Sequence, residues 1–263
     1  MVKLALHPAI WRPQGDEGLR LALTEMGEVG WDGFEWSAGA VKDVAKFKEN
    51  IKGTGVAVAG LYAAAGWLDP EKLPEEMERQ ARNVDVCAEL GRAHIMLDGG
   101  RWELTGNTED QVKIIADCSN KVGEMAKKKG IQATWHQHWG SIFEYEELFY
   151  LFMELTDPDL VHCTAETAQM ALSWFDLPAV FKAFAKRMSY VHFKDIDRHR
   201  RMIELGSGTV DFPTLWGIMK EAGFDGWIVV DLDYTSLPPR ESAEVQLRYL
   251  NEVLGIPSAR SQN

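Results

Sequence analysis

The chain has 263 residues, 46% of them hydrophobic, and its 40 acidic and 28 basic side chains give a formal charge of −12. That length suits one large α/β domain with a sizeable core, and the acidic balance disfavours nucleic acid and anionic membrane surfaces as partners. No apolar run approaches the ~20 residues needed to span a bilayer, and the first residues are too polar for a signal peptide. We therefore expect a soluble, cytoplasmic protein.

Short apolar runs alternate with longer amphipathic stretches along the whole chain. Runs typical of strands occupy residues 3–7, 33–36, 56–62, 94–98, 131–136, 160–164, 188–193 and 227–231. Stretches typical of helices lie between them and include residues 73–90, 109–129, 144–155 and 177–187. Several glycines stand shortly before a strand, as glycines that end helices do: Gly30, Gly53, Gly91, Gly130 and Gly223.

Alternating strands and helices predict parallel strands joined by right-handed crossovers. Eight such units favour a closed (β/α)8 TIM barrel over an open doubly wound sheet. The first strand of an open sheet would lead into GxGxxG, whereas this chain has HPAIW at 7–11. No linker or low-complexity run interrupts the pattern. We predict a single domain over residues 1–256, followed by a flexible C-terminal tail at 257–263.

Three cysteines, Cys87, Cys118 and Cys163, lie far apart in the sequence and form no CxxC pair. A sparse and odd set of this kind indicates reduced, buried thiols in a cytosolic protein. It does not suit a disulfide framework or a zinc site.

Within residues 131–138, 161–166 and 228–233, every second side chain is apolar and the others are polar, apart from Gln137 and Val229. Because barrel strands alternate between the helix layer and the interior, the polar set is expected to point inward. It grows denser toward the C-terminal ends of the strands, where barrel enzymes hold their active sites. The acids and imidazoles at these ends are His136, His138, Glu166, His192, Asp195, Asp231 and Asp233.

One inward side chain from each of strands five to eight falls at a similar depth: His136, Glu166, His192 and Asp231. Burying such groups around one axis without a counter-charge would be very costly, and a bound cation removes that cost. A mixed imidazole and carboxylate set suits Mn, Co, Fe or Zn better than Ca or Mg. We predict one divalent metal, Mn²⁺ first, with Co²⁺, Zn²⁺, Fe²⁺ or Mg²⁺ as alternatives. Hydrogen-bonded polar residues without a metal are the competing interpretation.

The segment WHQHWGS at 135–141 resembles the HxHxGT segment of inosose (2-keto-myo-inositol) dehydratases, which belong to the xylose isomerase-like sugar isomerase/epimerase superfamily. VHFKD at 191–195 is similar to the family's VHxKD strand, and ELGSGTVDF at 204–212 is similar to its E-x-G-x-G-x-x-D-F loop. GFDGW at 223–227 resembles its G-Y-x-G-W strand, and GFE at 33–35 resembles its early G-x-E. The resemblance implies a TIM barrel that processes a small polyhydroxylated substrate.

Two positions depart from the family pattern. ETAQ at 166–169 stands where the family has DTGH, and Asp231 stands where the family has Glu after strand eight. Glu166 is one methylene longer than the family's Asp, and Asp231 is one methylene shorter than the family's Glu. A metal shifted toward strand eight would still reach both side chains. Gln169 cannot carry a proton as the family histidine does.

A cation that binds the carbonyl and a neighbouring hydroxyl of a keto-sugar stabilises the enediolate and so acidifies the α C–H. Epimerisation, isomerisation and dehydration share this first step, and the residues leave all three open. By resemblance to the epimerases, Asp231 is both metal ligand and base. His138 and Lys194 are candidates for the second proton carrier. The alternative interpretations are that His138 only forms hydrogen bonds and that Lys194 forms a structural salt bridge. HQH at 136–138 matches the dehydratase subgroup, which makes dehydration of an inosose-like ring the leading reaction.

Four charged side chains on the predicted strand-end loops are candidates for binding sugar hydroxyls: Glu35, Arg101, Arg198 and Glu204. The alternative is that these side chains are only solvated. Tryptophans follow the first five strands: Trp11, Trp36, Trp67, Trp102 and Trp139. Their rings suit the weakly apolar faces of a cyclic polyol. Loop packing or the interface of a homo-oligomer would use them equally well.

Two other functions remain open. An abasic-site endonuclease of the same superfamily would need three zinc ions and further histidines after strands three and four. Those ends read YAAA at 62–65 and DGG at 98–100, and the acidic charge also opposes DNA. The other alternative is a non-catalytic ligand-binding barrel with a degenerate metal site, which elemental analysis of the purified protein would distinguish from an enzyme.

Overall fold

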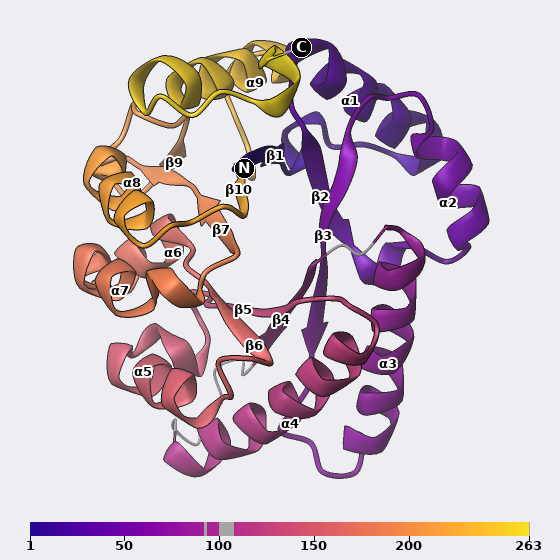
Figure 1. The fold of residues 1–263 in the computed structure, drawn as a ribbon, viewed down its shortest axis with the longest axis vertical. Coiled ribbons are helices and arrows are strands. Elements are labelled where there is room, and N and C mark those ends of the chain that lie inside the picture. The colour runs from indigo at the N-terminus through magenta and orange to yellow at the C-terminus, as the bar shows by residue number, and fades with distance from the viewer. Residues whose placement is uncertain (92–93, 100–107, 263) are drawn as a thin grey trace.

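In the computed structural model, which describes residues 1–91, 94–99 and 108–262, parallel strands surround a central axis and helices cover their outer side (Figure 1). The barrel strands are β1 (Lys3–Leu6), β2 (Gly33–Ser37), β3 (Ala57–Ala65), β4 (His94–Gly99), β5 (Ala133–His136), β6 (Val161–Thr164), β7 (Tyr190–Phe193) and β10 (Trp227–Val230). All eight predicted strands are present, and their ends shift by only a few residues. The prediction of a single-domain (β/α)8 barrel is confirmed.

The strands pair in the order β6-β5-β4-β3-β2-β1-β10-β7, and every pairing is parallel. The seam between β6 and β7 is closed by a single bridge that pairs Glu166 with His192. Beside it, the His192 amide donates to the Ala165 carbonyl at 3.0 Å. The barrel is therefore nearly closed, and its seam lies at the ends of the strands that carry the candidate site.

The helices begin where the sequence supplies caps and prolines. Thr108 forms a capping box with Gln111 ahead of α4, and the carboxylates of Asp176 and Asp211 accept the first free amides of α7 and α8. The α-helices are α1 (Gly15–Val29), α2 (Val44–Ile51), α3 (Leu73–Glu89), α4 (Glu109–Lys128), α5 (Glu146–Leu155), α6 (Thr167–Leu172), α7 (Leu177–Phe184), α8 (Phe212–Glu221) and α9 (Pro239–Arg248). Within the described ranges, none of these helices combines the length and apolarity needed to cross a bilayer.

The apolar residues form two layers, as the strand alternation predicts. In the outer layer, between strands and helices, Trp135 of β5 packs against Phe143 and Phe152, with ring centroids 5.1 and 4.4 Å away. The barrel interior is filled by Ala5, Ala59, Met96, Tyr190 and Val229. The three cysteines are buried and free, as predicted. Polar side chains thus reach the axis mainly at the C-terminal ends of the strands.

Two features were not predicted. After β7 the chain forms a short antiparallel hairpin of β8 (Asp195–Ile196) and β9 (Met202–Ile203). In the segment assigned to a flexible tail, the backbone amides of Ala259 and Arg260 donate to the carboxylate of Asp32 at 3.1 Å. The boundary at residue 256 stays a prediction, but the start of the tail contacts the barrel.

Candidate functional site

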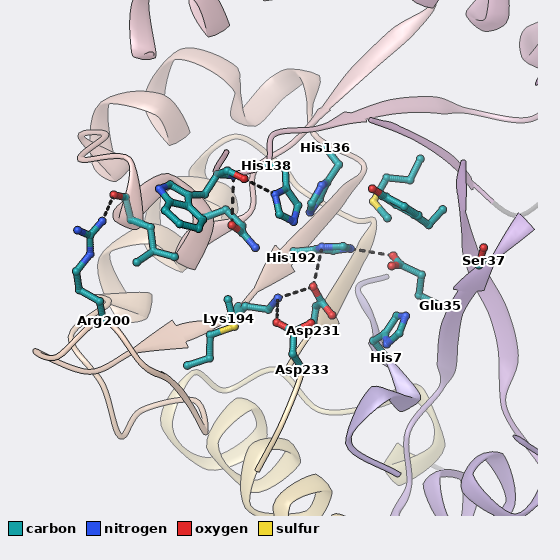
Figure 2. Close-up of a pocket in the computed structure, with 16 residues that line it drawn as sticks. His7, Glu35, Ser37, His136, His138, His192, Lys194, Arg200, Asp231 and Asp233 are labelled. Carbon is teal, nitrogen blue, oxygen red and sulfur yellow. Dashed lines mark hydrogen bonds and ion pairs between the residues drawn. The ribbon is translucent and has the colours of Figure 1, made fainter. Parts of the chain in front are cut away.

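A cavity of about 660 Å³ opens at the C-terminal ends of the barrel strands. Figure 2 shows its labelled side chains, which come from widely separated parts of the chain. The lining residues are His7, Glu35, Ser37, Tyr62, Met96, His136, His138, Trp139, Gln169, Leu172, His192, Lys194, Arg200, Met202, Asp231 and Asp233. This is the end of the barrel at which the sequence analysis predicts the acids and imidazoles of the site.

Three of the four predicted metal ligands line this cavity, and the fourth, Glu166, is fully buried and pairs with His192 across the seam. The rings of His136 and His192 lie 4.9 Å apart between centroids. Both ring nitrogens of His136, Nδ1 of His192 and Oε1 of Glu166 are buried without a hydrogen-bond partner. Buried polar atoms are normally satisfied, so this group of donors indicates a ligand.

Lys194 lies at the centre of the acidic part of the cavity. Its Nζ is 2.8 Å from Oδ2 of Asp231 and 3.0 Å from Oδ2 of Asp233, and its side chain is only 2% exposed. The alternation of β10 explains the pairing, since Asp231 and Asp233 follow this strand two residues apart and on the same face. A salt bridge was one of the two interpretations open for Lys194, and its partners are the two acids that follow β10.

Glu35 holds the other side of His192. Its Oε2 accepts hydrogen bonds from the Tyr190 hydroxyl at 2.7 Å and from Nε2 of His192 at 2.8 Å. All three side chains are buried. If Nε2 carries the proton that Glu35 accepts, Nδ1 of His192 is left as a lone-pair donor that faces Asp231 at 3.8 Å. Glu35 thus orients a candidate ligand, whereas the sequence suggested a substrate contact.

Burial and charge perturb the site strongly. Burial raises the pKa of Glu166 to about 7 and lowers the pKa of His136 well below its ordinary value. Burial alone would raise the pKa of Asp231, but Lys194, His7 and His192 together hold it well below its usual range. For Lys194 the effect of burial is outweighed by Asp231 and Glu166, which raise its pKa. Perturbations of this size are typical of functional sites.

The cavity offers donors for a divalent ion, although they are not assembled around one position. The described residues contain no three His, Cys, Asp or Glu side chains already grouped around one cation position. Four carboxylates, those of Glu35, Glu166, Asp231 and Asp233, nevertheless share this region with one ammonium group. With the unpartnered nitrogens and oxygen, this excess of negative charge fits a metal, provided that Lys194 releases Asp231. The ligand set itself stays a prediction.

Other predicted site residues lie elsewhere. Glu204 is buried outside the cavity, where it accepts hydrogen bonds from Thr235 and from Ser242 of α9. Arg198 lines a separate surface hollow on the β8–β9 hairpin. The structure therefore does not bring either residue to the cavity. Arg101 lies outside the described residues.

His138 and Trp139 do line the cavity. Nδ1 of His138 lies 2.5 Å from the carbonyl oxygen of Trp139, which ties the imidazole to its own loop. Trp67 is instead buried and donates to the Asp98 carbonyl, and Trp11 donates to Glu25. Trp102 lies outside the described residues.

Several cavity residues were not predicted as part of the site. His7 directly follows β1 and Tyr62 lies on β3, so their places at strand ends were an available signal. Asp233 was noticed only as one of the acids at the strand ends. The sequence around Arg200 does not indicate a place at the cavity, because the β8–β9 hairpin that carries Arg200 was not predicted.

Comparison with known proteins agrees with this architecture. The family described as Xylose isomerase-like TIM barrel matches residues 23–253. An inosose dehydratase of Clostridium beijerinckii is 26% identical over 296 residues, covering 97% of this chain and 98% of that protein. An inosose dehydratase of Lacticaseibacillus casei is 27% identical over 172 residues, so that the match spans only 58% of each protein.

Two solved structures share the fold. The structure of L-ribulose 3-epimerase superimposes with a TM-score of 0.82 at 18% identity, covering 97% of this chain and 95% of that one. The IOLI protein with a bound zinc atom gives a TM-score of 0.79 at 15% identity, with 96% and 98% covered. Because the family match spans most of the sequence, the chain belongs to the xylose isomerase-like TIM barrel family.

Proposed function

We propose that this member of the xylose isomerase-like TIM barrel family is a metal-dependent enzyme that removes a proton α to the ketone of a keto-polyol. The observation that carries the proposal is the group of unpartnered donor atoms on His136, Glu166 and His192 beside the Lys194–Asp231 pair. Relatives named inosose dehydratase support a cyclic polyol substrate. The three free thiols and the absence of spanning helices in the described ranges support a cytoplasmic location.

His136, Glu166, His192 and Asp231 are the residues that would hold the metal, with Mn²⁺ as our first choice for this mixed donor set. A related fold crystallised with zinc supports a divalent ion. When bound, such an ion supplies a Lewis acid that polarises the substrate ketone and stabilises negative charge on its oxygen.

Asp231 is the proposed base, and Lys194 is the proposed acid. Asp231 takes the α-hydrogen as a proton, and the electron pair of that C–H bond forms the new C=C bond. The C–O bond at the β carbon then breaks, and the departing hydroxyl leaves as water with a proton from Lys194. Lys194 and Asp231 line the same cavity, so the proton on Asp231 can pass to Lys194 and restore both groups for the next turnover.

Epimerisation or isomerisation is the second candidate. His138 lines the cavity, so it offers a second group that can return a proton to carbon. The same first step would then end without loss of water. The products distinguish these outcomes, since dehydration alone changes the mass of the substrate.

The proposal is tested by solvent exchange. Metal-loaded protein is incubated in D2O with a panel of inososes and ketohexoses, and NMR follows the α-hydrogen. We expect exchange or loss of that hydrogen in the parent and neither in Asp231→Asn, which keeps the shape of the side chain but not the basic carboxylate. A parent that binds metal yet shows neither exchange nor product with the whole panel would leave a ligand-binding barrel as the better interpretation.

A further inference from the structure

The cavity is larger than one cyclic polyol requires. Its volume is about 660 Å³. A six-membered polyol displaces roughly six or seven waters, which is ~200 Å³ at ~30 Å³ for each water. Most of the cavity therefore stays free when a single ring is bound at the titratable cluster.

The two ends of the cavity differ in chemistry. The inner end carries the titratable cluster that includes Glu35, His192 and Asp231. Around α6 the lining is different: the Trp139 amide is bonded to Gln169 and the Arg200 guanidinium to the Leu172 carbonyl, and the lining residues there are Trp139, Leu172, Arg200 and Met202. We call these last four residues the outer arm. Figure 2 shows Arg200 on the opposite side of the cavity from Glu35 and Ser37, with His138 and His192 between them. A small, fully hydroxylated ring would leave this largely apolar arm without a partner.

Trp139 presents a large apolar surface at the mouth of the cavity. Its side chain is 52% exposed, although its backbone amide is fixed by Oε1 of Gln169 at 3.2 Å. Trp139 also borders a neighbouring hollow of about 250 Å³ that it shares with Tyr62 and His138. An exposed indole beside a polar cavity is suited to stacking on another ring.

The outer wall of the arm is held in a strained conformation. Three described non-glycine residues have positive φ, and two of them, Trp174 at 65° and Arg200 at 63°, contact each other. The Arg200 guanidinium lies 5.3 Å from the centroid of the Trp174 ring and donates to the Leu172 carbonyl. Strained backbone persists where the surrounding structure enforces it, and it concentrates at ligand-binding positions. Arg200 is thus fixed at the arm although the residue is exposed.

We propose that the outer arm binds a second ring of the substrate, so that the preferred substrate is a keto-glycoside, while a free inosose or ketohexose binds through the inner cluster alone. The ketone-bearing ring lies at the inner cluster and is joined through oxygen to a second ring. That ring stacks on Trp139, while its oxygens accept from Arg200. The identity of the first ring rests on the proposed function. Two sources share the chemistry of the second ring, namely another sugar and an aryl group.

Binding of unoxidised glycosides tests the arm without turnover. Isothermal titration compares methyl β-D-glucopyranoside, phenyl β-D-glucopyranoside, cellobiose and myo-inositol on the purified parent. We expect phenyl glucoside or cellobiose to bind at least about tenfold tighter than the two one-ring probes, since aromatic stacking has about that effect. A gain with phenyl glucoside alone identifies an aryl group, and a gain with cellobiose alone identifies a second sugar.

Trp139→Ala and Arg200→Ala should each remove most of this gain, and their exposure makes folded variants the expected result, checked by circular dichroism. Tyr145→Ala is the matched control, because Tyr145 is an exposed aromatic residue that does not line the cavity. Equal binding of the four probes, no binding of any of them, or an undiminished gain in both variants would overturn the proposal. Because the probes lack a ketone, this outcome is independent of the D2O exchange result.

Discussion

Replacing Glu35 by Gln asks whether the buried carboxylate prepares His192 for a metal. Oε2 of Glu35 accepts from both Tyr190 and His192, and the amide oxygen of Gln can accept the same two bonds without the charge. Charge-assisted bonds contribute ~1.5–3 kcal/mol and neutral ones ~0.5–1.5 kcal/mol. The loss is therefore about 1 kcal/mol for each bond, or about 2 kcal/mol of unfolding free energy.

The effect on metal affinity should be larger than the effect on folding. Glu35 is one of the groups that raise the pKa of His192, and it fixes which ring nitrogen is free. Loss of such an outer carboxylate typically weakens metal binding 10–100-fold. Isothermal titration with Mn²⁺ or Zn²⁺, together with urea denaturation of the metal-free protein, measures the two effects separately. NMR titration of the His192 ring should show a lower pKa in the variant.

Asp32→Asn serves as the control, because Asp32 is also a buried carboxylate that accepts backbone amides, those of Leu4, Ala259 and Arg260. It does not line the cavity, so it should lower stability and leave metal affinity within about twofold. If Glu35→Gln behaves like Asp32→Asn, destabilised but with parental metal affinity, Glu35 does not prepare His192 and the reasoning fails.

Three further predictions concern Lys194, Glu166 and the packing of the loop on the β8–β9 hairpin. Lys194→Met should reduce dehydration at least ~100-fold while α-hydrogen exchange in D2O continues; loss of both would show that Lys194 is needed for proton abstraction. In metal-free protein, Glu166 stays protonated in the folded state up to about pH 7 but ionises near 4.5 when unfolded, so its stabilising contribution is lost as pH rises through this window. That loss is about 3 kcal/mol. Urea denaturation below and above this pH window should show the loss in the parent protein and not in Glu166→Gln. Gly208→Ala should lower stability by ~1–3 kcal/mol, because a Cβ there would lie 2.3 Å from Oδ1 of Asp195; an unchanged melting temperature would contradict this.

The barrel was predictable because its signals are local. Alternation of apolar and polar residues identifies a strand and its inner face from a few neighbours, so His136 and Asp231 were placed correctly at the cavity. The contact between Glu35 and His192 joins residues 157 positions apart, and no local pattern encodes it. Glu204 is the opposite case: it is a charged residue near a strand end, but its carboxylate accepts a hydrogen bond from Ser242 outside the cavity, and a role in substrate binding stays a prediction. The two-residue strands of the hairpin are too short to show any period.

The position of the site at the seam between β6 and β7 links metal binding to the stability of the barrel. Other neighbouring strands of the barrel share registers of two or more residue pairs, whereas this seam has the single Glu166–His192 bridge and the amide bond to Ala165. The two residues that close the ring of strands are also two of the proposed ligands. An ion held by both residues would link β6 to β7, where neighbouring strands share the fewest backbone pairs. Amides of β7 should then exchange with solvent more slowly when the ion is bound, so the occupancy of the site can be measured on the backbone, away from any substrate.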